Sequence, residues 1–134
     1  YIDSSLKSSG VEMQESFLDG DTLYIHGHES LGKYELNDFE TVVMGHEHPA
    51  IALEDDIGVR EKISAFLYGE MDDGRNIVVM PAFSRIANGT AVNEVPKNEL
   101  LSLVLRENCT ISRLKAVGIS RDAGVLEFAE LKHL

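Results

Sequence analysis

Val42-Val43-Met44-Gly45-His46-Glu47-His48-Pro49 is the stretch that organises this chain, together with the shorter stretch Ile25-His26-Gly27-His28. Each is an apolar run followed by a His-x-His cluster, and the two clusters hold four of the five histidines. An apolar run that ends in glycine and polar residues is typical of a strand delivering side chains to its end. Neutral imidazole is the commonest metal ligand in proteins. The pattern therefore predicts a metal site between two neighbouring strand ends.

The segments around the clusters predict an α/β fold that opens with strands 22–25 and 41–44. A helical or irregular connection over 30–40 would join them as in a βαβ unit, so both clusters are expected at the same edge of the sheet. The first twenty residues are polar and Ser-rich. They predict a short helix or an irregular lead-in that ends in a turn at Asp19-Gly20-Asp21.

After Pro49 the pattern becomes β-rich. Apolar segments separated by turn sequences predict strands over 50–53, 59–68 and 76–83. The continuous apolar run Ile77-Val78-Val79-Met80 predicts a strand that is buried on both faces. We expect a short helix over 99–107 with Asn98 as its N-cap, and a closing hairpin made of 110–120 and 125–131.

Composition limits the classes of partner. The length of 134 residues suits a single domain with its own core, and we expect one domain over 1–134. A net charge of −11 argues against binding nucleic acid through its phosphates. No apolar run is long enough to span a membrane. The single cysteine, Cys109, rules out an internal disulfide and fits a cytoplasmic location.

Two further classes of metal site fit the clusters less well. A cupin would need a glutamate three or four residues after its His-x-His, whereas five residues separate His48 from Glu54, and only His133 remains downstream. A zinc finger is excluded by the cysteine count. Histidines that are simply exposed or hydrogen-bonded remain the alternative to a metal site. Glu47 is expected to face solvent and Cys109 to fill the core.

The two clusters resemble the last two motifs of the calcineurin-like metallophosphoesterases, and within them the archaeal and bacterial predicted-phosphoesterase branch. That superfamily carries the ordered motifs Asp-x-His, Gly-Asp, Gly-Asn-His-Asp/Glu, His-Gly-His and Gly-His-x-His. Here His26-Gly27-His28 and Gly45-His46-Glu47-His48 match the last two in order and context. The likeness to the branch covers about residues 20–131 and includes Gly58-x-Arg60-x-Lys62, Phe66-Leu67-x-Gly69, Pro81-Ala82-Phe83-Ser84 with Gly89 and Asn93, and Leu100-Leu101-Ser102.

The first three motifs of the superfamily are absent. No histidine follows Asp-x or an asparagine, and Gly20-Asp21 precedes His26 too closely to be the second motif. The resemblance therefore implies the carboxyl-terminal half of a two-sheet metallophosphoesterase sandwich, β-rich with few helices, whose missing motifs would lie before Tyr1. Such a half would leave a sheet edge unpaired, so we expect pairing with the amino-terminal half or a homo-oligomer.

The resemblance also implies a function: hydrolysis of a phosphate mono- or diester by a hydroxide held between two divalent ions, which are manganese, iron, zinc or nickel. His26 and His46 match ligands of one ion, and His48 matches a ligand of the other. His28 matches a catalytic position that orients a ligand or touches the substrate, with a supporting hydrogen bond behind a ligand as the alternative. Arg60 and Lys62 are candidates for binding the phosphate, and otherwise face solvent or pair with nearby acids.

Three ligands are too few for two ions. We therefore expect the chain by itself to bind one ion well at most and to be inactive or nearly so. The alternative function is a non-catalytic module, derived from the same fold, that binds a metal or a partner. The coding sequence before Tyr1 separates the two, because Gly-Asn-His-Asp directly upstream would support the enzyme and a natural start would support the module.

Overall fold

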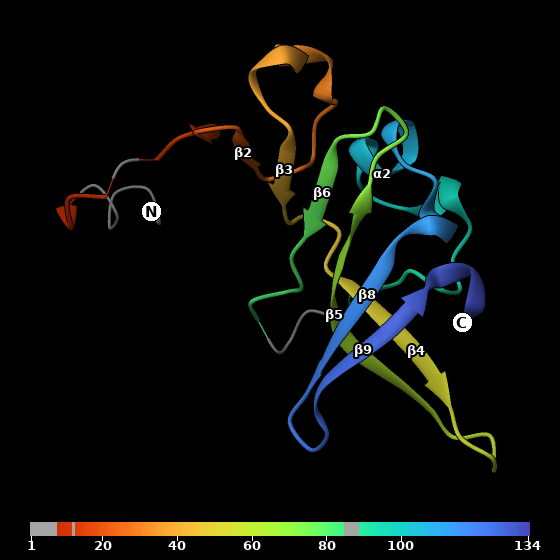
Figure 1. Ribbon diagram of the computed structural model, residues 1–134. Coiled ribbons are helices and arrows are strands. Elements are labelled where there is room, and N and C mark those ends of the chain that lie inside the picture. The colour runs from red at the N-terminus through yellow and green to blue at the C-terminus, as the bar shows by residue number, and fades with distance from the viewer. Residues whose placement is uncertain (1–7, 12, 85–88) are drawn as a thin grey trace.

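The computed structural model describes residues 8–11, 13–84 and 89–134, which are built around one mixed β-sheet (Figure 1). The strand order is β1-β2-β3-β6-β5-β4-β7, with β8 paired to β5 and β9 paired to β8. The strands are β1 Ser16–Asp19, β2 Thr22–Ile25, β3 Thr41–Met44, β4 Pro49–Glu54, β5 Arg60–Glu70, β6 Asn76–Val79, β7 Thr90–Ala91, β8 Lys115–Ser120 and β9 Gly124–Glu130. The fold is thus β-rich, as expected, with one α-helix in the described part of the chain, α2 Leu103–Asn108.

The parallel part of the sheet consists of β2, β3 and β6. Leu23 pairs with Val42 and Val42 pairs with Ile77, so the three strands run in the same direction in register. The connection between β2 and β3 contains two short 3-10 turns, Leu31–Lys33 and Leu36–Asp38. The strands predicted over 22–25 and 41–44 are confirmed, and their carboxyl ends lie side by side.

The antiparallel part of the sheet is organised by the long strand β5. Its first half pairs with β4, whereas its second half pairs with β6 and β8. The turn between β4 and β5 is held by the Asp55 carboxylate, which accepts hydrogen bonds from the backbone N–H groups of Ile57 and Val59. The closing hairpin of β8 and β9 is confirmed, although β8 begins at Lys115, later than expected.

Three local predictions are wrong. The helix expected over 99–107 begins only at Leu103, because the N-cap is Ser102 and not Asn98; the residues before it form a 3-10 turn, Lys97–Glu99. The lead-in contains strand β1, which pairs antiparallel with β2, while residues 1–7 and 12 of the expected lead-in lie outside the described residues. The strand expected over 76–83 ends at Val79, and the run from Ile77 to Met80 is not buried on both faces, because 46% of Met80 is exposed.

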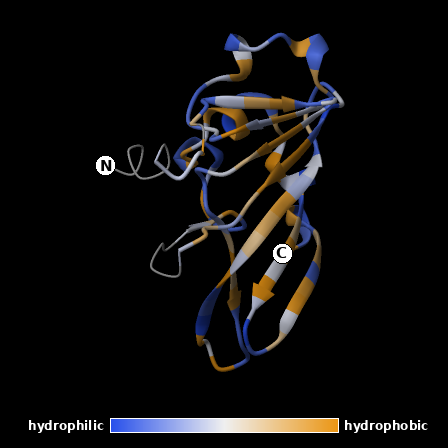
Figure 2. Ribbon diagram, turned by 90° about the vertical axis from the view of Figure 1, so that its left-hand side faces the viewer, coloured by the Kyte–Doolittle hydropathy of each residue, from blue (hydrophilic) through white to orange (hydrophobic). Residues whose placement is uncertain are grey.

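The two faces of the sheet differ. Buried side chains from β2, β3, β5, β6 and β8 share one face with Val104 and Leu105 of α2, and form the core. The short helix α2 and its flanking loops therefore cover the core side of the sheet. Figure 2 shows apolar residues along the strands. As a separate finding, none of the described helices is long and apolar enough to span a membrane.

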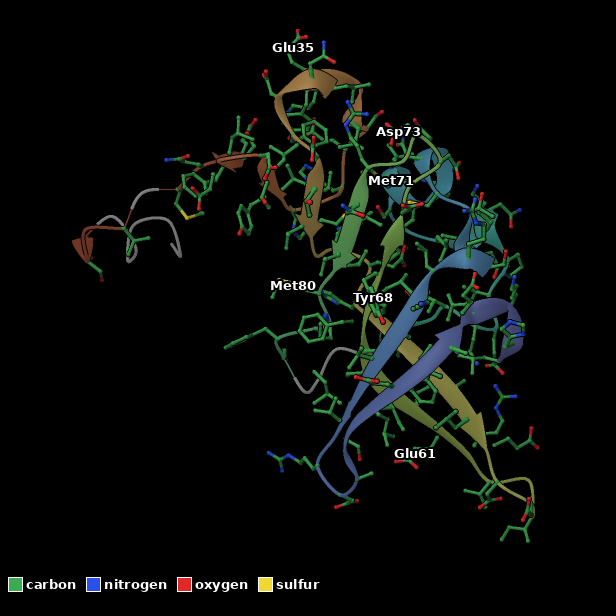
Figure 3. The ribbon with its side chains drawn as sticks, in the orientation of Figure 1. Glu35, Glu61, Tyr68, Met71, Asp73 and Met80 are labelled. Atoms are coloured by element: carbon green, nitrogen blue, oxygen red, sulfur yellow. The ribbon has the colours of Figure 1, made fainter. Side chains whose placement is uncertain are left out.

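The opposite face, here called the open face, carries a row of residues that are direct register partners: Phe17, Tyr24, Val43, Val78 and Tyr68. Phe17 is 52% exposed and Tyr24 is 42% exposed, and their rings lie 6.0 Å apart. The side chain of Tyr68 is labelled in Figure 3. Parallel strands are normally covered on both faces. The open face is therefore unusually exposed for this kind of sheet.

Candidate metal centre

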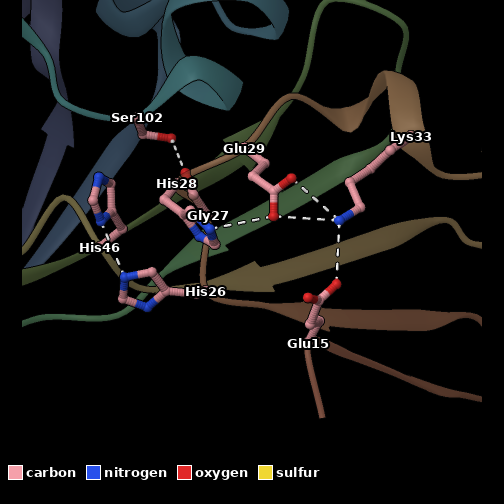
Figure 4. A network of polar contacts seen from close by, with 8 residues as sticks. All are labelled: Glu15, His26, Gly27, His28, Glu29, Lys33, His46 and Ser102. Carbon is pink, nitrogen blue, oxygen red and sulfur yellow. Dashed lines mark hydrogen bonds and ion pairs between the residues drawn. The ribbon is translucent and has the colours of Figure 1, made fainter.

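Both histidine clusters lie at the same edge of the sheet, as expected. His26 directly follows β2 and His46 follows the end of β3 by two residues, and the N–H of Gly45 donates a hydrogen bond to the carbonyl of His26 (3.0 Å). The ring atoms His26 Nε2 and His46 Nδ1 lie 3.0 Å apart, at hydrogen-bond distance (Figure 4). The parallel pairing of β2 and β3 thus brings together two imidazoles that are distant in sequence.

The other two histidines flank this pair. The ring of His28 lies 5.3 Å from that of His26 and 6.1 Å from that of His46, and its Nε2 lies 3.2 Å from a carboxylate oxygen of Glu29. His48 is half-buried at the end of the second cluster. Partial burial lowers the pKa of His26, and the imidazoles of His46, His28 and His48 lower it further. His26 is therefore biased toward the neutral form, which is the form that binds metals.

The backbone of the second cluster is strained. His46 and His48 have φ angles of 65° and 53°, and within residues 8–11, 13–84 and 89–134 they are the non-glycine residues with positive φ. Histidine enters this region more readily than most residues, but at a cost. The carbonyl of His48 accepts a hydrogen bond from the N–H of Thr90 (2.9 Å), and an added Cβ on Gly89 would lie 2.6 Å from the same oxygen. The neighbouring strand therefore holds His48 in this conformation.

Glu47, between the two strained histidines, was expected to face solvent, and that prediction is wrong. Its side chain is fully buried. The carboxylate accepts hydrogen bonds from the Thr90 hydroxyl (2.7 Å) and from the N–H groups of Leu101 (3.1 Å) and Ser102 (2.9 Å). Sequence reasoning missed this role because the three donors lie far along the chain from Glu47.

Ser102 contacts the first cluster as well. It is fully buried, and its hydroxyl donates to the carbonyl of Gly27 (3.2 Å) while accepting from the N–H of Leu105 at the start of α2. Gly27 has a φ of 103°, and a Cβ at this position would lie 3.0 Å from the Met44 sulfur. The first cluster therefore makes its turn at a buried glycine, held from behind by Ser102.

The nitrogen donors fit a divalent transition metal. Two imidazole nitrogens bound to one ion at about 2.0–2.1 Å lie roughly 3.0–3.4 Å apart, close to the separation between His26 and His46. No three His, Cys, Asp or Glu side chains of the described residues are grouped as a single-ion site. His26 and His46 are thus the pair that could share an ion, with His48 and His28 beside them.

Arg60 and Lys62 are placed on β5, away from the strand ends that carry the histidines. The guanidinium of Arg60 is paired with the Glu94 carboxylate. The ammonium of Lys62 donates to the carbonyl of Gly89 (2.9 Å), the glycine that lies against His48. The pairing of Arg60 is the alternative considered from the sequence, whereas Lys62 supports the loop next to His48.

A cavity of about 330 Å³ opens beside the first cluster. Its lining includes His26 and His28, together with Phe17 and Tyr24 of the open face. Phe17 was not foreseen as part of the site because strand β1 was missed. A signal was present, since two apolar pairs separated by Gly20-Asp21 are a hairpin pattern.

Two further residues named in the sequence analysis, Cys109 and Asn93, lie outside the clusters. Cys109 fills the core as expected, and burial raises the pKa of its thiol to about 12, so the reactive thiolate is disfavoured. The side-chain amide of Asn93 bonds to both the N–H and the carbonyl of Ala52, which makes it a bridge to strand β4. Neither residue is placed to act on a ligand of the histidines.

Comparisons with known proteins yield no match for this chain. No family model matches it, and neither a curated protein nor a solved structure does. Membership of a family is therefore a proposal, which depends on the histidine clusters and on the geometry described above.

Proposed function

We propose that this chain carries the histidine half of a dinuclear metal site in a phosphoesterase of the calcineurin-like superfamily. The observation that carries the proposal is the 3.0 Å approach of His26 and His46 at the ends of adjacent parallel strands. Ligands of open α/β sheets are generally found at this position. The lowered pKa of His26 and the strained backbone of His46 and His48 add support, because both features are frequent at functional sites.

In this proposal His26 and His46 bind one ion, and His48 binds the other. The ions are manganese, iron, zinc or nickel, all of which accept imidazole nitrogen. When bound, two such ions stabilise the charge on a phosphate ester and activate the water that attacks it. His28, of which the side chain is 56% exposed, is available to orient the substrate. The Lys62 ammonium would have to leave the Gly89 carbonyl, and the Arg60 guanidinium the Glu94 carboxylate, to reach a phosphate.

The open face supports the finer fold that we propose, a sandwich of two sheets. Phe17, Tyr24 and Tyr68 lie exposed on the open face, whereas the opposite face of the sheet already packs against the core. Sheets in such a sandwich pack face to face about 10 Å apart with interdigitated side chains. A second sheet on the open face would also form a wall of the cavity beside His26 and His28. Its strand ends could then supply the carboxylate and amide ligands that two ions require.

The second sheet would come from an amino-terminal half of the domain or from a second copy of the chain. The substrate is a phosphate ester, and neither nucleic acid nor a membrane is a proposed partner, in keeping with the net charge of −11. We place the protein in the cytoplasm, where a single free thiol such as that of Cys109 stays reduced. The 134 residues by themselves are proposed to bind one ion and to have little or no activity.

The second candidate function is a non-catalytic module that binds a metal or a partner. The exposed aromatic residues of the open face favour it, because apolar patches of this kind often mark interaction surfaces. In that case the histidines would bind one structural ion, and no further ligands would be needed. Both candidates predict that the chain binds metal. Only the phosphoesterase is expected to hydrolyse a phosphate ester once the second sheet is supplied.

The test is metal binding by the purified 134-residue chain, followed by assays with a phosphate monoester and a diester. Isothermal titration with Zn²⁺ or Mn²⁺ should give one ion per chain, and His46→Ala should weaken binding strongly. His133→Ala is the control, because His133 lies in the last turn of the chain, Leu131–His133. Failure to bind either metal would refute the proposal. Rapid turnover by the chain alone would refute the claim that further ligands are needed.

A further inference from the structure

The Glu47 carboxylate is buried between two candidate ligands without being a ligand itself. Its three hydrogen-bond donors are the Thr90 hydroxyl and the N–H groups of Leu101 and Ser102. All three are directed at one side chain with no exposure to solvent. Burying a carboxylate without hydrogen-bond partners would cost much folding free energy, so these three hydrogen bonds are needed to keep Glu47 in this place.

The main chain of Glu47 is fixed as well. Its N–H donates to the carbonyl of Gly45 at 2.7 Å, and its carbonyl lies 3.0 Å from the Thr90 hydroxyl, which shares its one proton between this carbonyl and the Glu47 carboxylate. The residues on either side, His46 and His48, have the left-handed backbone conformation. Such a conformation persists only where its surroundings enforce it. Glu47 is held by hydrogen bonds at its place between the two strained histidines, and the Thr90 N–H holds the carbonyl of His48 beside it.

The two histidine clusters meet at Ser102. Its N–H donates to Glu47 in the second cluster, and its hydroxyl donates to the carbonyl of Gly27 in the first. Figure 4 shows Ser102 above Gly27, with His26 and His46 below it. Ser102 is also the N-cap of α2, whose residues Val104 and Leu105 are packed in the core. Ser102 thus links the two clusters by hydrogen bonds, in addition to the pairing of β2 and β3.

We propose that Glu47 is a positioning residue. Together with Ser102 it holds the His26 and His46 imidazoles at the spacing and orientation that binding one ion requires. This inference rests on the proposed function, because its first test measures metal binding. Glu47 works before any ion arrives, because its hydrogen bonds are made within the chain. Loss of one of them would leave the ligands present but no longer aligned.

The decisive variant is Glu47→Gln, which keeps the shape of the side chain but replaces one acceptor oxygen by an N–H₂ group. At least one of the three donors then loses its acceptor. We expect the affinity for Co²⁺ to fall by about 10- to 100-fold, as is usual for residues that orient metal ligands. The visible absorption spectrum of bound Co²⁺ should also change, because the ligand geometry changes. Far-UV circular dichroism confirms that the variant is folded.

The matched control is Glu35→Gln, which removes the same charge from an exposed position before the turn Leu36–Asp38. It should bind Co²⁺ with the affinity and spectrum of the parent chain. If Glu47→Gln lowers the melting temperature while the folded protein keeps its affinity and spectrum, Glu47 is merely structural and the inference is overturned. If Glu47→Gln does not fold, Thr90→Val decides, since it removes one donor: weaker binding supports the inference, and unchanged binding overturns it.

A second readout separates this inference from the proposed function. In the metal-free chain, nuclear Overhauser contacts between the rings of His26 and His46 should be present and should be lost in Glu47→Gln. A chain that shows this loss but binds no Co²⁺ would support the positioning role while refuting the proposed function. Parent and variant chains with the same ring contacts would overturn the positioning role whatever their affinity for metal.

Discussion

The two histidine clusters share the pattern His-x-His but make their turns in different ways. In the first cluster the middle residue, Gly27, takes the positive φ, and both histidines are exposed. In the second cluster the histidines take the positive φ themselves, and the middle residue is the buried Glu47. The first turn is cheap because glycine adopts it freely, whereas the second has to be held by hydrogen bonds. The same sequence pattern therefore produces one turn that a glycine makes without strain and one turn in which both histidines are strained.

The largest expected effect is a loss of Zn²⁺ affinity, which should be much greater when a proposed ligand is removed than when a neighbouring histidine is removed. His46→Ala removes one of the two imidazoles of the 3.0 Å pair and should weaken Zn²⁺ binding by more than about 100-fold. His28→Ala should weaken it by about tenfold or less, because His28 lies beside the pair. Isothermal titration of both variants measures the difference. Equal losses for the two would show that the clusters contribute in the same way.

The strained second turn should be sensitive to crowding from the neighbouring strand. In Gly89→Ala the new Cβ would lie 2.6 Å from the His48 carbonyl at a φ of 65°, so we expect a loss of about 2–4 kcal/mol of unfolding free energy. Gly74→Ala has a comparable φ of 89° but open space around the Cβ, and should cost only about 1–2 kcal/mol. Urea unfolding gives both values. A smaller loss for Gly89→Ala than for Gly74→Ala would contradict the proposed contact.

The anchor shared by both turns should matter to a smaller extent. Ser102→Ala removes the hydrogen bond to Gly27 and the cap of α2, which together are worth about 1–2 kcal/mol. Because the first turn loses its anchor, Co²⁺ binding should weaken several-fold. Ser30→Ala, which removes the cap of the turn Leu31–Lys33, is the control and should leave binding unchanged. Equally strong binding by the parent chain and both variants would show that Ser102 does not position the ligands.

The smallest expected effect is on pH dependence. The pKa of His26 is lowered in the folded chain, chiefly by the partial desolvation of its ring, so the unfolded chain takes up this proton first as the pH falls through about 6.5. Stability of the metal-free protein should therefore decline from about pH 6.5 downward until the folded-state pKa of His26 is passed, and be fully retained above that range. Urea unfolding between about pH 8 and about pH 5 measures the slope. His26→Gln should make the slope shallower, and an identical slope would contradict the assignment.

Much of the sheet follows from local sequence. The apolar runs over 22–25 and 41–44, with a connection between them, were enough to predict adjacent parallel strands and hence the meeting of His26 and His46. Strand β1 was missed because its residues are polar at the ends and only Phe17 and Leu18 are apolar. The start of α2 was misplaced because Asn98 and Ser102 are both good capping residues, and only tertiary packing selects between them.

The site was harder to predict wherever distant residues decide the outcome. Glu47 looks like a solvent residue in sequence, and its burial depends on donors at Thr90, Leu101 and Ser102. The apolar run ending at Met80 indicates burial on both faces, but the open face carries no covering layer of described residues. Local pattern therefore predicts which residues meet at the sheet edge. It does not predict what holds them in place.

The proposed function depends above all on His26 and His46 binding the same ion, which X-ray absorption of the zinc-loaded chain can test. We predict at least two imidazole nitrogens at about 2.0–2.1 Å from zinc in the parent chain. His26→Ala and His46→Ala should each remove one of them. Zinc bound without imidazole, or an unchanged nitrogen shell in both variants, would contradict the shared site.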